Sequence, residues 1–125
     1  HALMAKETLG ESIGLLHRAG RLNHFHFNDN YRGWDDDMIV GSVHFMPFVE
    51  AIYWLKRIGY SNWISLDLFP YREDPDLAVT ESIAYLRRLD EIVDEIGMET
   101  ITDLLHQNDG ARTLRVINQH VLGTS

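Results

Sequence analysis

The sequence predicts an α/β protein whose parallel strands form part of a barrel wall. Segments with helical period and segments with strand period alternate in the order helix, strand, helix, strand, helix. Parallel strands joined by crossover helices are the usual arrangement for that order. In both expected strands one face is aliphatic or phenyl and the other mixes polar with apolar groups. Such asymmetry fits a wall between surrounding helices and a barrel interior.

The first two helices are each expected to end at a glycine. Residues 5–19 carry leucine and isoleucine at helical spacing, and Gly20 follows as the C-terminal cap. Residues 43–58 form the second expected helix, which Gly59 ends.

A long third helix is expected to begin at Asp74-Pro75 and to end at Gly97. Beyond it, the Asn-Asp-Gly triplet at 108–110 separates two shorter helical stretches. We interpret these stretches as a capping or oligomerising tail. The chain therefore divides into a main segment and a helical tail, residues 1–97 and 98–125.

Two stretches alternate with the two-residue period of a β-strand. In RLNHFHFN, residues 21–28, a mixed face opposes a phenyl face: Leu22, His24, His26 and Asn28 against Phe25 and Phe27. In NWISLDLF, residues 62–69, a mixed face opposes an aliphatic face: Trp63, Ser65 and Asp67 against Ile64, Leu66 and Leu68.

Charge and composition disfavour several classes of partner. The formal net charge is −8, and phosphate neutralisation needs clustered Lys and Arg, so neither nucleic acid nor a metal-dependent endonuclease activity is expected. The sequence has no hydrophobic stretch long enough to span a membrane and no signal peptide pattern. The absence of cysteine excludes disulfides and thiolate metal sites. We expect a soluble, cytoplasmic protein without a membrane partner.

Polar side chains gather at the carboxyl ends of the two expected strands, where active sites of such barrels lie. His26 and Asn28 stand at the end of the first strand, and Asp67 stands at the end of the second. The loop that holds Asp35 and Asp37 leaves from the same end of the sheet. We therefore expect these groups to converge.

Convergence of this kind suits a divalent ion, which takes oxygen and imidazole ligands from separate segments. The candidate ligands are His26, Asp35, Asp37 and Asp67, while Asp36 is excluded because alternation turns it away from its neighbours. Among these residues, Asp67 is the hardest to explain without a bound cation, because an unpaired carboxylate among aliphatic residues is costly to bury. Two ordinary alternatives stay open: WDDDM as a solvated acidic turn, and His26 as a hydrogen-bonded core group.

These segments resemble the xylose-isomerase-like barrels, a family that includes L-rhamnose isomerases and ketose 3-epimerases. HFHFNDNYR is similar to the H-x-H segment at the end of the family's seventh strand. WDDDMIVGS resembles its loop with two metal-binding aspartates, and GYSNWISLDLFPYRED resembles its eighth strand, which ends in a metal-binding carboxylate. The opening HALMAKETLGESIGLL resembles the segment that follows the sixth strand and begins with a histidine.

The resemblance implies specific roles for residues of this chain. It implies metal ligation by five residues: His1, His26, Asp35, Asp37 and Asp67. It implies substrate contact by Arg32, six positions after the second histidine of the H-x-H segment. A complete barrel needs about 250 residues, so we expect a partial (β/α)8 barrel: its last two β-strands with their helices plus a C-terminal helical tail. The family's metal-binding glutamate on the fifth strand and aspartate on the sixth have no counterparts here.

The function implied by the resemblance is a metal-dependent aldose–ketose sugar isomerase of the L-rhamnose or xylose isomerase type. One ion would bind adjacent oxygens of the sugar and a second would polarise its carbonyl. Manganese, cobalt, magnesium or zinc would suit imidazole and carboxylate ligands. The paired aspartates favour isomerisation over single-metal ketose 3-epimerisation, which remains the enzymatic alternative, and no residue is assigned as catalytic. We expect the chain to be a fragment that is inactive alone.

Further groups surround the expected site. Asn28 is a candidate for sugar binding, and Trp34 and Phe69, together with Trp63, are candidates for an apolar wall against the C–H face of the sugar. Plain packing is the alternative for these aromatic residues. A quarter barrel would expose sheet edges and the inner faces of its helices, so a homo-oligomer is expected. The same exposure supports a third hypothesis, a non-catalytic self-associating module.

Overall fold

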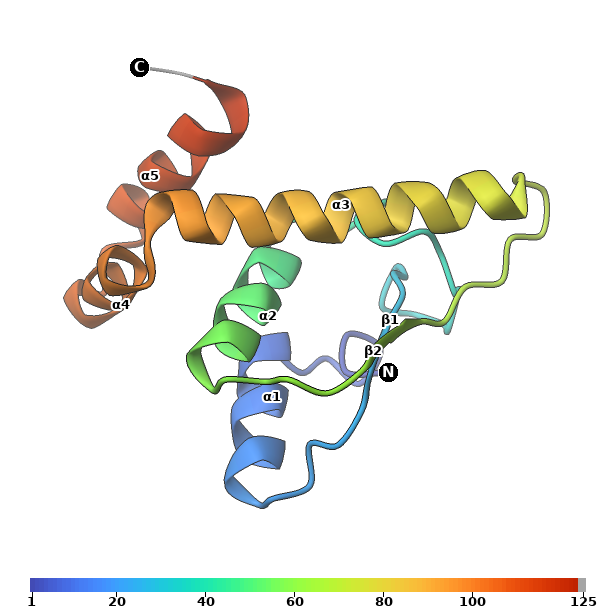
Figure 1. Cartoon of the computed structure of the whole chain (residues 1–125), viewed down its shortest axis with the longest axis horizontal. Helices are drawn as coiled ribbons and strands as arrows, with labels where there is room; N and C mark the ends of the chain where they lie inside the picture. Colours follow the sequence, from blue (N-terminus) through green and yellow to red (C-terminus); the bar gives the residue numbers. More distant parts are fainter. Residues whose placement is uncertain (124–125) are drawn as a thin grey trace.

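Seven elements follow one another in the described part of the chain, residues 1–123 of a computed structural model (Figure 1). They are α1 (Leu9–Arg18), β1 (Phe25–Phe27), α2 (Met46–Arg57), β2 (Ile64–Leu66), α3 (Pro75–Ile96), α4 (Met98–Gln107) and α5 (Gly110–Leu122). In Figure 1, α3 runs along the molecule, α1, α2 and the two strands lie on one side of it, and α4 and α5 lie at its C-terminal end. The element order is the predicted one.

Local sequence explains where the helices begin and end. The side chain of Asp74 accepts a hydrogen bond from the Leu77 N–H at 3.0 Å, and Pro75 occupies the first helical position of α3. Gly97 ends that helix with φ 88°, a conformation that favours glycine. These boundaries confirm the predicted third helix. Asp109 caps α5 in the same way, accepting from the Arg112 N–H at 3.0 Å.

The predicted barrel is wrong, because the described residues contain one open sheet of two short parallel strands. The pairing is Phe25 with Ile64, His26 with Ser65, and Phe27 with Leu66. Each strand therefore has three residues instead of the expected eight. The reason lies just after β1, where Asp29 pairs antiparallel with Met38 in both hydrogen-bond directions, at 3.0 and 2.9 Å. This bridge turns the chain away from β2, and the fold is a mixed α/β arrangement with an open sheet.

The core lies between the phenyl face of the sheet and the helices. Phe27 is 1% exposed and packs edge-on against Phe48 of α2, with ring centroids 5.7 Å apart. Leu89 and Val93 of α3 are also fully buried. The opposite face of the sheet, which the barrel prediction placed in an interior, exposes the side chains of His24 and His26.

The acidic loop between β1 and α2 is fastened to α3. The Val40 N–H donates to Ser82 Oγ at 3.2 Å, and Ser82 is completely buried. Gly41 has φ 84° and lies directly against the ring of Tyr85, where no β-carbon fits. Two positions on α3 therefore fix the course of the loop that carries the candidate ligands.

The helices α4 and α5 both pack against α3. Thr102 of α4 also shares a hydrogen bond with the Tyr53 hydroxyl of α2, at 3.0 Å. The division at residue 97 stays a prediction, and residues 124–125 of the expected tail lie outside the described part. Across residues 1–123, every helix is too short or too polar to cross a membrane.

Candidate metal centre

The first pair of candidate ligands stands at the carboxyl end of the sheet. His26 Nδ1 lies 3.5 Å from Asp67 Oδ2, and the two residues come from neighbouring parallel strand ends. Their side chains are 56% and 54% exposed. Asp67 is therefore not the buried carboxylate that the sequence predicts, because more than half of its side chain is exposed to water.

A second pair joins His1 to the acidic loop. His1 Nε2 lies 3.3 Å from Asp35 Oδ2. The other carboxylate oxygen, Asp35 Oδ1, is buried and has no hydrogen-bond partner among the described residues. A buried carboxylate oxygen without a donor is costly. An ion bound at Asp35 would remove that cost.

The Asp37 carboxylate is affected by one member of each pair, Asp35 and Asp67. Partial burial and then the Asp35 carboxylate raise the pKa of Asp37 above 3.8, and the Asp67 carboxylate raises it further. The hydrogen bond that Asn28 Nδ2 donates to Asp37 Oδ1, at 2.8 Å, acts in the opposite direction. The Phe69 N–H donates to the Asp37 carbonyl at 3.0 Å, which ties the loop to the segment after β2. The carboxylates of Asp35 and Asp67 thus both repel that of Asp37.

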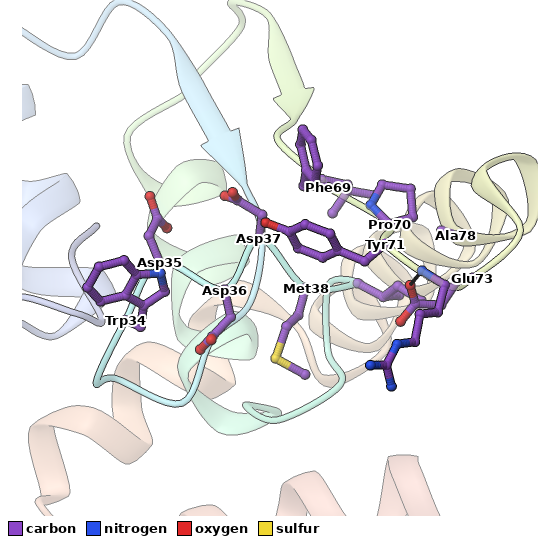
Figure 2. A pocket seen from close by; sticks show the side chains of 13 residues that line it. Trp34, Asp35, Asp36, Asp37, Met38, Phe69, Pro70, Tyr71, Glu73 and Ala78 are labelled. Atoms are coloured by element: carbon purple, nitrogen blue, oxygen red, sulfur yellow. Dashed lines mark hydrogen bonds between the residues drawn. The ribbon is translucent and has the colours of Figure 1, made fainter.

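Side-chain directions in the loop follow the predicted alternation. Figure 2 shows the carboxylates of Asp35 and Asp37 on one side of the loop and that of Asp36 on the other. Asp36 Oδ2 accepts a hydrogen bond from the Tyr31 N–H at 3.0 Å. Asp36 therefore has a local partner and takes no part in the cluster.

A pocket of about 590 Å³ opens beside the acidic loop. Asp35, Asp36 and Asp37 line one side, and Trp34 and Phe69 also line it (Figure 2). The two aromatic side chains are 75% and 60% exposed, so they do not serve the core. The pocket therefore combines carboxylates with apolar surface, which suits a small polar ligand that has C–H faces.

Other polar contacts here were not predicted. His24 Nε2 and Ser65 Oγ share a hydrogen bond at 2.8 Å, and the His24 ring lies edge-on to His26 with centroids 4.7 Å apart. The two-residue alternation of the sequence already places His24 on the same face as His26, and Ser65 on the same face as Asp67. It therefore indicates that these polar side chains lie on one face of the sheet. Arg32, the predicted substrate contact, donates from Nε to His44 Nε2 at 3.0 Å.

The candidate ligands do not form one closed metal site. Within residues 1–123 the structure has no group of three or more His, Cys, Asp or Glu side chains that could hold a metal ion. His26 with Asp67, His1 with Asp35, and Asp37 with Asn28 are the contacts present. The donor set nevertheless fits a divalent ion, because it combines imidazole nitrogen with carboxylate oxygen and leaves one buried carboxylate oxygen without a partner.

Comparison with known proteins adds no family: no family model matches the chain, and no curated protein matches it.

Proposed function

We propose that this chain contributes ligands and pocket residues to the divalent-metal centre of an aldose–ketose sugar isomerase in the cytoplasm. The observation that carries the proposal is the pairing of its candidate ligands: His26 with Asp67 at 3.5 Å and His1 with Asp35 at 3.3 Å. The resemblance of the same segments to xylose-isomerase-like enzymes supports it. Manganese, cobalt, magnesium or zinc would suit these donors.

The electrostatics of the acidic loop support a bound cation. Asp35 keeps a buried oxygen that has no hydrogen-bond partner among residues 1–123, and the pKa of Asp37 is raised by its burial and by two neighbouring carboxylates. A cation among these groups would replace repulsion with attraction. The separation into two pairs, with Asp37 between them, favours two ions over one and so favours isomerisation over single-metal epimerisation.

Each residue of the chain has a defined task in this proposal. His26 and Asp67 would hold one ion, and His1, Asp35 and Asp37 would hold the other, with Asn28 fixing the orientation of Asp37. When bound, the ions supply Lewis-acid polarisation of the sugar carbonyl. Isomerisation reduces one carbon of the sugar and oxidises its neighbour by moving hydrogen between them, so no redox cofactor is needed.

The test is a calorimetric titration with Mn²⁺ of the wild-type chain and of three single variants. Asp35→Asn and Asp67→Asn should each weaken Mn²⁺ binding by at least about tenfold, since even outer partners of metal ligands contribute that much. Asp36→Asn is the matched control: it removes the same charge from the same loop, and an Asn oxygen can still accept from the Tyr31 N–H. Its Mn²⁺ affinity should stay within about twofold of wild type.

Sugar binding completes the test. Titrations with L-rhamnose and D-xylose should show binding with Mn²⁺ present and none after chelation. If Asp35→Asn and Asp36→Asn lost the same amount of Mn²⁺ affinity, the loop would attract cations only through its charge. Absence of Mn²⁺ binding to the wild-type chain would overturn the proposal.

A non-catalytic self-associating module is the second candidate. The open sheet and the exposed aromatic residues around it favour this reading, because Trp63 is 83% and Tyr71 is 77% exposed. Large apolar groups in water near an unpaired strand edge mark a contact surface. This candidate predicts a defined oligomer without metal or sugar binding.

A further inference from the structure

We infer that the side-chain amide of Asn30 donates a hydrogen bond to a hydroxyl oxygen of the bound sugar, inside a small cavity beside the proposed metal centre. The inference rests on the function proposed above, because the sugar is the ligand of that centre. It adds a substrate contact that neither the alternation of β1 nor the resemblance assigns.

The amide nitrogen of Asn30 is a buried donor without an acceptor. Asn30 is 1% exposed. Its Oδ1 accepts a hydrogen bond from the Arg32 N–H at 2.8 Å, and this contact assigns the other end of the amide as nitrogen. Within residues 1–123, Asn30 Nδ2 has no hydrogen-bond partner. A buried donor without a partner is costly, so an oxygen atom from a ligand would lower the free energy of this group.

A cavity of about 70 Å³ provides the space for such an oxygen, and Asn30 is one of the residues that line it. One water molecule needs roughly 10–15 Å³, so the cavity has room for a hydroxyl group together with its carbon atom. The side chains of Leu3, Leu9 and Phe48 form the apolar part of the lining. A hydrogen-bond donor next to apolar surface suits one end of a polyol.

The polar residues of the cavity connect it to the proposed metal centre. Besides Asn30, three polar residues line the cavity, and each of them contacts a different candidate carboxylate. The contacts are His1 to Asp35 at 3.3 Å, His26 to Asp67 at 3.5 Å, and Asn28 to Asp37 at 2.8 Å. A sugar bound at that centre therefore lies beside the cavity, which would take one hydroxyl-bearing carbon of the sugar.

A purely structural role would not need the amide nitrogen. The Asn30 N–H donates to Asp29 Oδ1 at 2.9 Å, and Asn30 Oδ1 accepts from the Arg32 N–H. Both contacts hold the local turn, and a serine hydroxyl can accept the second of them. An ordered water molecule is the alternative partner for Asn30 Nδ2. Sugar affinity distinguishes the two, because only a contact with the sugar makes that affinity depend on Asn30.

The test is a calorimetric titration of the full chain with D-xylose and L-rhamnose at saturating Mn²⁺. Asn30→Ser keeps an oxygen for the Arg32 N–H and removes the amide donor, so it should weaken sugar binding about tenfold. Asn23→Ser is the matched control, because it makes the same change at an exposed position just before β1. Its sugar affinity should stay within about twofold of wild type.

Two further measurements separate a sugar contact from damage to the fold. In Asn30→Ser, Mn²⁺ affinity should stay within about twofold of wild type, and the urea midpoint should move by less than about 0.5 M. A ¹H–¹⁵N spectrum of the wild-type chain follows the Asn30 Nδ2 signals directly, with diamagnetic Mg²⁺ in place of Mn²⁺. These signals should shift when the sugar is added, and the Asn23 side-chain signals should not. This measurement decides the question even if Asn30→Ser does not fold.

Each contrary result identifies which proposal fails. Unchanged sugar affinity in a folded Asn30→Ser, or amide signals that do not shift in a chain that binds the sugar, would overturn the Asn30 contact alone and leave water as its partner. A wild-type chain that binds Mn²⁺ but neither sugar would overturn the contact and the sugar class. A wild-type chain that binds no Mn²⁺ would overturn the proposed metal centre and the contact with it.

Discussion

Asp37 is the residue in which the competing demands of stability and binding are clearest. Its carboxylate lies near those of Asp35 and Asp67, its burial raises its pKa, and its backbone has φ 46°. Asparagine tolerates that conformation well and can still accept the hydrogen bond from Asn28. Asp37→Asn therefore removes charge with little change in geometry.

We expect Asp37→Asn to stabilise the metal-free protein at pH 7 by roughly 0.2–1 kcal/mol, the range of partly exposed charge pairs. A raised folded-state pKa means that the ionised group destabilises the fold, so this gain is present at neutral pH. The gain should disappear as the pH falls through the raised pKa and then below 3.8, where wild-type Asp37 becomes neutral in both states. Urea unfolding at pH 7 and pH 3.5 checks the sign, and Mn²⁺ affinity should fall in the same variant. A variant less stable than wild type at pH 7 would contradict the account.

At the scale of single residues, the sequence predicts side-chain directions that are set by neighbouring positions along the chain. The two-residue period separates Asp35 and Asp37 from Asp36, as Figure 2 shows. The contacts of Asp29 with His44 do not follow from any period, because they join residues 15 apart through a turn. Which donors reach a buried carboxylate depends on how that turn closes, and only the structure shows it.

Among the elements, both ends of α3 are well predicted, whereas α1 begins at Leu9 instead of residue 5 and α2 at Met46 instead of residue 43, and the strand lengths are wrong. Caps such as Asp74 and Gly97 act within a few residues, so their effect is local. A strand also needs a partner, and β1 loses its partner where Asp29 pairs with Met38. The alternating pattern of residues 62–69 continues beyond the end of β2. Leu68 still packs against the core, although it does not belong to a strand. Whether two parallel strands close into a barrel depends on other strands, which a two-strand pattern does not reveal.

The helix α3 provides a direct test of how packing stabilises this fold. Leu89 is 1% exposed and lies in the core, whereas Leu77 on the same helix is 58% exposed. Leu89→Ala should lower the free energy of unfolding by about 2–5 kcal/mol, through lost burial and the cavity left behind. Leu77→Ala makes the same chemical change at the surface and should cost about 0.5 kcal/mol or less. Urea denaturation of both variants measures the difference, and equal costs would contradict the burial pattern of α3.

The contact between α3 and the acidic loop depends on Gly41. An alanine there would have to adopt φ 84°, and its β-carbon would overlap the Tyr85 ring. Gly20 has φ 64° and no atom near its missing β-carbon, so Gly20→Ala isolates the backbone cost, about 1–2 kcal/mol. Gly41→Ala should cost about 1–3 kcal/mol more than Gly20→Ala, because of overpacking. It should also weaken Mn²⁺ binding by displacing the loop, and thermal unfolding with calorimetry checks both effects. Equal stabilities of the two variants would show that the Tyr85 contact yields easily.

For the whole molecule, exposed apolar surface favours association between copies of the chain, whereas the net charge opposes it. Large aromatic side chains stand in water around the sheet and the pocket: Trp63, Tyr71, Trp34 and Tyr31. Among residues 1–123 each strand also has only one neighbour, so each retains an unpaired edge within that part of the chain. The net charge of −8 acts against contact between copies of the chain. Composition made both tendencies visible, but only the open sheet shows where the apolar contact would form.

We predict that the chain self-associates through the face that carries Trp63, and that salt strengthens the association. At about 1 M ionic strength charge repulsion is screened within roughly 3 Å, while burial of aromatic surface is retained. The weight-average mass in sedimentation equilibrium should therefore rise with protein concentration, and rise more steeply at high salt. Trp63→Ser, which changes an 83% exposed side chain, should lower that mass at equal concentration. Leu122→Ser, which changes a 65% exposed side chain on α5, should leave it unchanged. If Leu122→Ser lowered the mass and Trp63→Ser did not, the contact surface would lie on the tail helices and the open sheet would face solvent in the oligomer.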